Sequence, residues 1–94
     1  MLIANLTDLI WLLNVLTWAA FFGVAIVPLL VAIQVKSFAL RILSLLLGLF
    51  AITHGLYHLA LAYGLYFVAQ VILEPVSVTF LLAFGIYYSR KADF

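Results

Sequence analysis

The sequence contains no cysteine and very few charged residues. Without cysteine the chain has no disulfide, no thiolate metal ligand and no cysteine nucleophile. Charged side chains make up 7% of the 94 residues, whereas a soluble domain carries roughly 25%. The composition therefore excludes an ordinary soluble domain. The formal net charge of +1 is also too small to predict nucleic acid as a partner.

Hydrophobic residues make up 70% of the sequence. They form three continuous runs, each long enough to cross a hydrocarbon core of about 30 Å at about 1.5 Å per residue. The runs do not alternate in ten-residue units, as the strands of a membrane β-barrel do. The sequence therefore predicts an all-α, polytopic membrane protein with a single transmembrane domain over residues 1–94.

The predicted helices cover residues 8–33, 38–63 and 68–88. Ser37 ends the first connection, and its hydroxyl is placed to cap the second helix. Inside the first helix, Pro28 removes a backbone hydrogen bond and predicts a kink.

The position of the second connection has two alternatives. We place it at residues 64–67, because the run from residue 38 to residue 88 is long enough for two spans and one tight turn. A break at Glu74 and Pro75 is the alternative, but it leaves a last helix of only about 24 Å, which is short for a span.

The basic residues predict the orientation. With three spans in an up-down-up arrangement, Lys36, Arg41, Arg90 and Lys91 all fall on one side of the membrane. The positive-inside rule then places the N-terminus outside and the C-terminus in the cytoplasm, most simply in the cell (plasma) membrane. In this topology the polar residues within the spans gather in the outer leaflet.

The only two histidines stand four residues apart, so on a helix they lie on one face. With a turn near Tyr66, His58 and Glu74 are each eight residues from it and lie at the same depth. His54, His58 and Glu74 are therefore a candidate metal site, with copper, zinc or haem shared with partner chains as the candidate cofactors. The alternative is that each histidine forms a hydrogen bond with a neighbouring helix. No glutamate follows His54 directly, so the pair is no metalloprotease motif.

Two further sets of residues accompany the histidines. A stripe of small residues, which permits close packing of membrane helices, runs along the second helix; it comprises Gly48, Ala51, Gly55 and Ala62. A polar cluster in the predicted outer leaflet comprises Asn14, Thr17, Tyr57 and Gln70.

Two functions follow as hypotheses. The first is a small accessory subunit of a larger membrane complex, such as a respiratory oxidase or a metal-dependent membrane monooxygenase, because three helices make a small core. Its partners are then lipids and other transmembrane subunits, and the chain alone is not expected to be catalytic. The alternative is a homo-oligomeric carrier or channel for a metal ion or small solute that uses His54, His58 and Glu74.

Overall fold

The computed structural model describes residues 6–90, which form three helical spans. Helix α1 covers Leu6–Gln34, α2 covers Phe38–Ala62, the π-helical segment η1 covers Val68–Leu73 and α3 covers Glu74–Arg90. Segment η1 continues directly into α3, so Val68–Arg90 is one span. All three spans are long and apolar enough to cross a membrane. The predicted all-α class with three membrane-length helices is confirmed, and such helices indicate an integral membrane protein.

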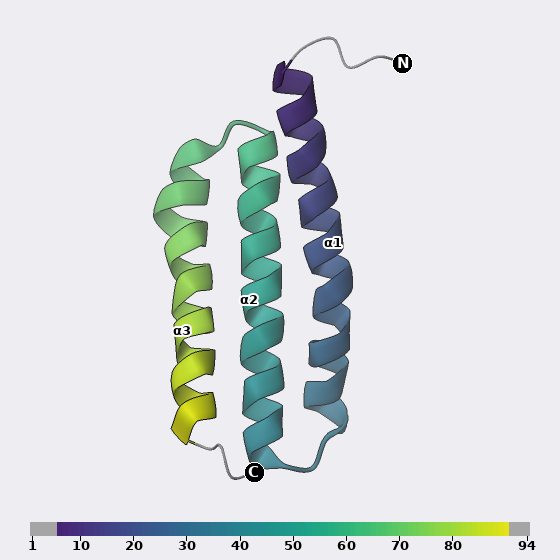
Figure 1. The fold of residues 1–94 in the computed structure, drawn as a ribbon, viewed down its shortest axis with the longest axis vertical. Coiled ribbons are helices and arrows are strands. Elements are labelled where there is room, and N and C mark those ends of the chain that lie inside the picture. The colour runs from purple at the N-terminus through teal and green to yellow at the C-terminus, as the bar shows by residue number, and fades with distance from the viewer. Residues whose placement is uncertain (1–5, 91–94) are drawn as a thin grey trace.

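The three spans lie side by side, and consecutive spans run in opposite directions (Figure 1). Their bounds lie within two residues of the predicted ranges. The α1–α2 connection and the C-terminal end of α3 are at one end of the molecule, and the α2–η1 connection is near the other (Figure 1). Lys91 and residues 1–5 lie outside the described residues.

Both ends of α2 are formed by the local chemistry of the connections. At its start, the Ser37 hydroxyl accepts from the Leu40 backbone N–H at 3.4 Å, which confirms the predicted cap. At its end, Gly64 adopts a left-handed φ of 75°, and the Leu65 N–H reaches back to the Ala60 carbonyl at 2.9 Å. This is a Schellman motif, for which glycine is the favoured residue.

Helices α1 and α2 pack closely because small residues line their contact. On α2, Gly48 and Gly55 are buried. A Cβ added at Gly48 would lie 2.5 Å from Leu29 Cδ2, and one added at Gly55 would lie 3.1 Å from Phe21 Cβ. On α1, Pro28 is buried at the same contact, and the helix continues through it to Gln34. The small-residue stripe is thus covered by α1 of the same chain.

The third span begins in a widened helix that the sequence did not predict. In η1, backbone hydrogen bonds reach five residues back, as from the Glu74 N–H to the Ala69 carbonyl. Pro75 follows directly; it has no N–H, and its ring would press on the carbonyl four residues before it in a regular α-helix. The wider turn relieves that pressure. The break at Glu74 and Pro75 therefore does not occur. Ala69 and Ser77, with no exposed surface, are the most deeply buried residues of this span.

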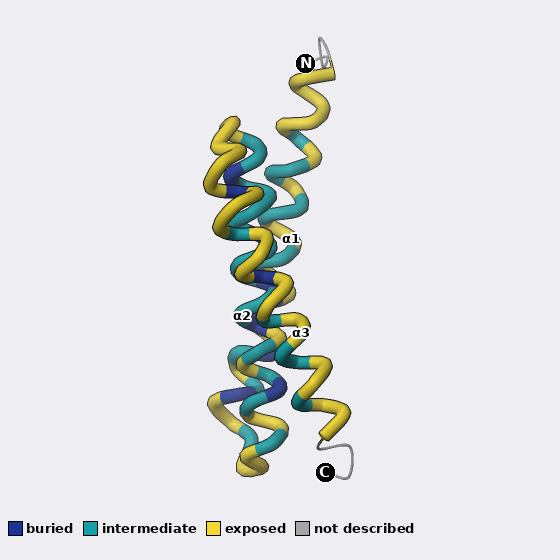
Figure 2. The backbone as a smooth tube through the Cα atoms, turned by 90° about the vertical axis from the view of Figure 1, so that its left-hand side faces the viewer, coloured by how far each residue is buried: buried dark blue, intermediate teal, exposed yellow. Residues whose placement is uncertain are grey.

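The whole assembly is a thin array centred on α2. Helices α1 and α3 each pack against α2 and not against each other, and the principal extents are 52 × 27 × 17 Å. Exposed residues run along most of the outer surface of the spans (Figure 2). Within the most apolar stretch of each span, only 11%, 22% and 11% of the residues are buried. The described chain therefore leaves most of its apolar surface for lipid or for other protein to cover.

Candidate functional site

The site begins with a hydrogen bond between α1 and α2. His58 Nδ1 lies 2.8 Å from Asn14 Oδ1, and both side chains are half-buried. Asn14 Nδ2 also donates to the Ile10 carbonyl at 3.0 Å, on its own helix. Because a carbonyl only accepts, the nitrogen end of the Asn14 amide faces Ile10 and the oxygen end faces His58.

This arrangement determines the tautomer of His58. Asn14 Oδ1 is an acceptor, so His58 Nδ1 carries the proton and donates it. In the neutral ring, Nε2 then holds a lone pair, and no hydrogen-bond partner for Nε2 is found in residues 6–90. His58 therefore offers an acceptor, or a metal ligand, on the side of the ring away from Asn14.

Aromatic rings surround the two histidines. Phe21 of α1 lies 4.8 Å from His54 and 6.3 Å from His58, measured between ring centroids. On α2, the rings of Phe50 and Tyr57 stack near His54 at 5.4 and 5.5 Å. The two imidazoles are 4.9 Å apart, edge to face. We call these five residues the ring cluster. Their ring contacts are partly near-parallel and partly edge to face, and the imidazole nitrogens and the Tyr57 hydroxyl are set among apolar ring carbons.

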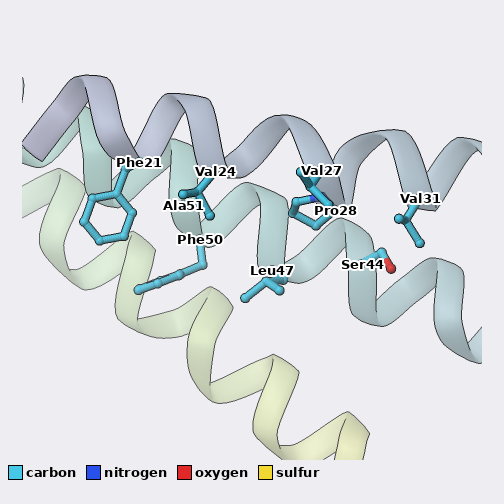
Figure 3. Close-up of a pocket in the computed structure, with 9 residues that line it drawn as sticks. All are labelled: Phe21, Val24, Val27, Pro28, Val31, Ser44, Leu47, Phe50 and Ala51. Carbon is cyan, nitrogen blue, oxygen red and sulfur yellow. The ribbon is translucent and has the colours of Figure 1, made fainter.

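An apolar groove between α1 and α2 adjoins the ring cluster. It has a volume of about 560 Å³. The groove is open along one side, and Phe21 and Phe50 belong to both the groove and the ring cluster (Figure 3). Its lining is otherwise aliphatic except for one hydroxyl; the residues are Phe21, Val24, Val27, Pro28, Val31, Ser44, Leu47, Phe50 and Ala51. The groove and the ring cluster thus form one continuous surface, apolar along most of its length and polar at one end.

The other predicted site residues are distributed around this surface. Glu74 is exposed. No hydrogen bond or ion pair between His58 and Glu74 is found in the described part of the chain. Gln70 is exposed, and Thr17 donates to the Leu13 carbonyl of its own helix at 2.8 Å.

Two further predictions concern the metal site and the small-residue stripe. Within residues 6–90, no three His, Cys, Asp or Glu side chains are grouped so as to hold a metal ion. The assignment of His54, His58 and Glu74 to a metal stays a prediction. Of the small-residue stripe, Gly48, Ala51 and Gly55 are buried and Ala62 is half-buried.

The Asn14–His58 pair was not predicted, although the sequence holds a signal for it. Asn14 and His58 each lie 22 residues from Lys36, in the centre of the first connection. Two helices joined by a short connection bring residues equally distant from it to the same depth. Equal depth does not say which way the side chains point, because that depends on how each helix is rotated about its axis. The place of Phe21 in the ring cluster depends on the same rotation.

Comparisons with protein families, curated proteins and solved structures find no match to this chain.

Proposed function

We propose that the chain is a small integral-membrane accessory subunit of a larger membrane complex, in which it stabilises or borders a site in the outer leaflet. The observation that carries this proposal is the thin array of helices, whose spans bury at most 22% of their most apolar stretches. An array one helix deep encloses no path of its own, and partner helices would cover its faces.

The orientation in this proposal is N-terminus outside and C-terminus cytoplasmic. Lys36, Arg41 and Arg90 are the basic residues of the described chain, and all lie at the end that holds the α1–α2 connection (Figure 1). The positive-inside rule makes that end cytoplasmic. His54 follows the start of α2 by 16 residues, or about 24 Å at 1.5 Å per residue, which puts the ring cluster in the outer half of the membrane.

The type of complex is argued from the histidine pair. Histidines that bind metals usually donate their second ring N–H to a fixed acceptor, which orients the ring and raises the basicity of the free nitrogen. Asn14 provides such an acceptor for His58. A respiratory oxidase or a metal-dependent membrane monooxygenase is therefore the proposed setting. Copper, zinc or haem would be shared with partner chains, which supply the ligands that this chain does not.

Native purification tests this proposal. The full chain, tagged at one end, is extracted in mild detergent from its own membranes and measured intact by mass spectrometry. We expect a complex with other transmembrane chains in fixed stoichiometry. Metal analysis and visible spectroscopy for haem are made on the same sample. Recovery of the chain alone, or only as copies of itself, contradicts the accessory role.

The second candidate function is a homo-oligomeric carrier or channel. It is favoured by one observation, that two ionisable side chains, His54 and His58, lie 4.9 Å apart inside a span, because ionisable groups inside membranes often mark ion paths. Transport of zinc or copper into proteoliposomes that contain only this chain tests it. Loss of uptake in His54→Ala and His58→Ala, with Tyr63→Phe as the unaffected control, supports this candidate; uptake that survives both changes rejects it.

A further inference from the structure

We propose that the groove and the ring cluster together form a binding site for a lipid quinone or quinol, an uncharged planar head on a long apolar tail. The juxtaposition that carries this inference is a groove with an almost wholly apolar lining that ends at stacked rings with hydrogen-bonding atoms. The site needs no partner chain and does not depend on the accessory role proposed above.

The groove suits the tail. Its lining on α1 runs from Val31 to Phe21, a rise of about 15 Å at 1.5 Å per residue. Its volume of about 560 Å³ is within the range of known small-molecule sites, roughly 300–1,000 Å³. The groove is open rather than enclosed. Because it lies between two helices that are long and apolar enough to cross a membrane, we expect its opening to face the hydrocarbon core, from which a tail can enter.

The ring cluster suits a planar head. Phe50, His54 and Tyr57 form a row along α2 in which neighbouring rings are 18° and 26° from parallel. A flat ring with π-electrons packs well against such a row. The polar atoms are also of both kinds: His58 Nε2 accepts, and the Tyr57 hydroxyl donates. A quinone carbonyl would accept from Tyr57, and a quinol hydroxyl would donate to His58.

The distribution of charge argues for an uncharged head. The basic residues Lys36, Arg41 and Arg90 lie at the opposite end of the array (Figure 1). A phosphate head at the ring cluster would therefore have no cation of the described chain nearby. This disfavours phospholipids and leaves uncharged heads.

Tryptophan fluorescence provides the test, because quinones quench indole emission. The chain has two tryptophans, and Trp18 lies on α1 one turn from Phe21. In the Trp11→Phe background, the full chain is placed in phosphatidylcholine nanodiscs and titrated with decylubiquinone. We expect saturable quenching of Trp18. Brominated phosphatidylcholine should quench without saturation and should not compete with decylubiquinone.

Three variants locate the ligand. His58→Phe with Tyr57→Phe keeps the rings and removes the two groups assigned to the head, the His58 Nε2 acceptor and the Tyr57 hydroxyl, and we expect about tenfold weaker binding or more. Val27→Phe should fill the groove and weaken binding by at least about tenfold. Ile26→Phe is the matched control for Val27→Phe: Ile26 is 57% exposed and Val27 64% exposed, but only Val27 lines the groove.

Circular dichroism and monodispersity confirm that each variant is folded before it is compared. Binding of decylubiquinone that is unaffected by Val27→Phe overturns the groove as the tail site. Equal binding by the parent and the His58→Phe, Tyr57→Phe chain overturns the ring cluster as the head site. Saturable quenching by brominated phosphatidylcholine that competes with decylubiquinone shows a phospholipid site instead.

Discussion

The hydrogen bond between Asn14 and His58 should couple α1 to α2 by about 1 kcal/mol. Interhelical hydrogen bonds in membrane proteins average about 0.6 kcal/mol and reach about 1.7. A coupling above that average is expected here, because the bond is 2.8 Å long, both side chains are half-buried and the Asn14 amide is already oriented by its bond to Ile10. A coupling of this size changes the unfolding equilibrium about fivefold.

A double-mutant cycle measures this coupling. Asn14→Leu, His58→Phe and the double variant are unfolded reversibly in mixed micelles, and the free energies of unfolding are compared. Thr17→Val combined with His58→Phe is the control pair, because Thr17 bonds only within its own helix. A coupling below about 0.3 kcal/mol for Asn14 and His58, or an equal coupling in the control pair, refutes the reasoning.

Nitrogen NMR of the same samples reads the tautomer directly. His58 should be protonated on Nδ1 in the parent chain, because Asn14 Oδ1 accepts from that nitrogen. In Asn14→Leu the acceptor is gone, and the signals should show a mixture of tautomers or the Nε2–H form. Finding Nε2–H in the parent would mean that the Asn14 amide is turned the other way.

Three further predictions use the same unfolding measurement. Gly55→Ala should lower the free energy of unfolding by about 1–3 kcal/mol, because the new methyl meets Phe21 Cβ, which is fixed to the backbone. Gly48→Ala should lower it less, because there the methyl meets a leucine side chain that can move; a larger loss for Gly48→Ala would contradict this. Gly64→Ala should cost about 1–2 kcal/mol because of its positive φ. Gly23→Ala should not destabilise the chain, because Gly23 lies inside α1 with open space around it and alanine is favoured over glycine in a helix interior by about 0.5–1 kcal/mol; an equal loss of stability at both positions would contradict a conformational cause. Ser77→Ala should cost no more than about 1 kcal/mol, since the hydroxyl donates only to the carbonyl three residues before it. Ser77→Leu should cost about 1–3 kcal/mol, because the site has no exposed surface to accommodate the larger side chain; a tolerated leucine would mean that α2 and α3 are not tightly packed there.

Much of the fold follows from the sequence because hydropathy dominates it. Three apolar runs predict three helices, and the connections carry their own signals in Ser37 and Gly64. The 3.6-residue period also predicts that Gly48, Ala51 and Gly55 share a face. It does not say which helix covers that face. The structure shows α1 there, so a partner chain would have to bind elsewhere.

The candidate site was less predictable for a physical reason. Side-chain pairing depends on how each helix is rotated about its axis, and apolar residues all around a helix leave that rotation undetermined. Thr17 illustrates the difficulty, since its hydroxyl bonds its own backbone although Asn14, one turn away, reaches α2. The groove likewise depends on the spacing of α1 and α2, which is set by glycines and Pro28.

The π-helical segment η1 also determines which residues of the third span face α2. Ala69 and Ser77 are eight residues apart, and in an uninterrupted α-helix they would point about 80° away from each other. Each π turn contains more residues than an α turn, so here the same eight residues complete close to two turns. Both side chains consequently meet α2 with no exposed surface. The segment thus holds one extra residue that keeps Ala69 and Ser77 on the same face of the span. Deleting one residue from it would rotate α3 beyond Pro75, so that each position there would face a different neighbour.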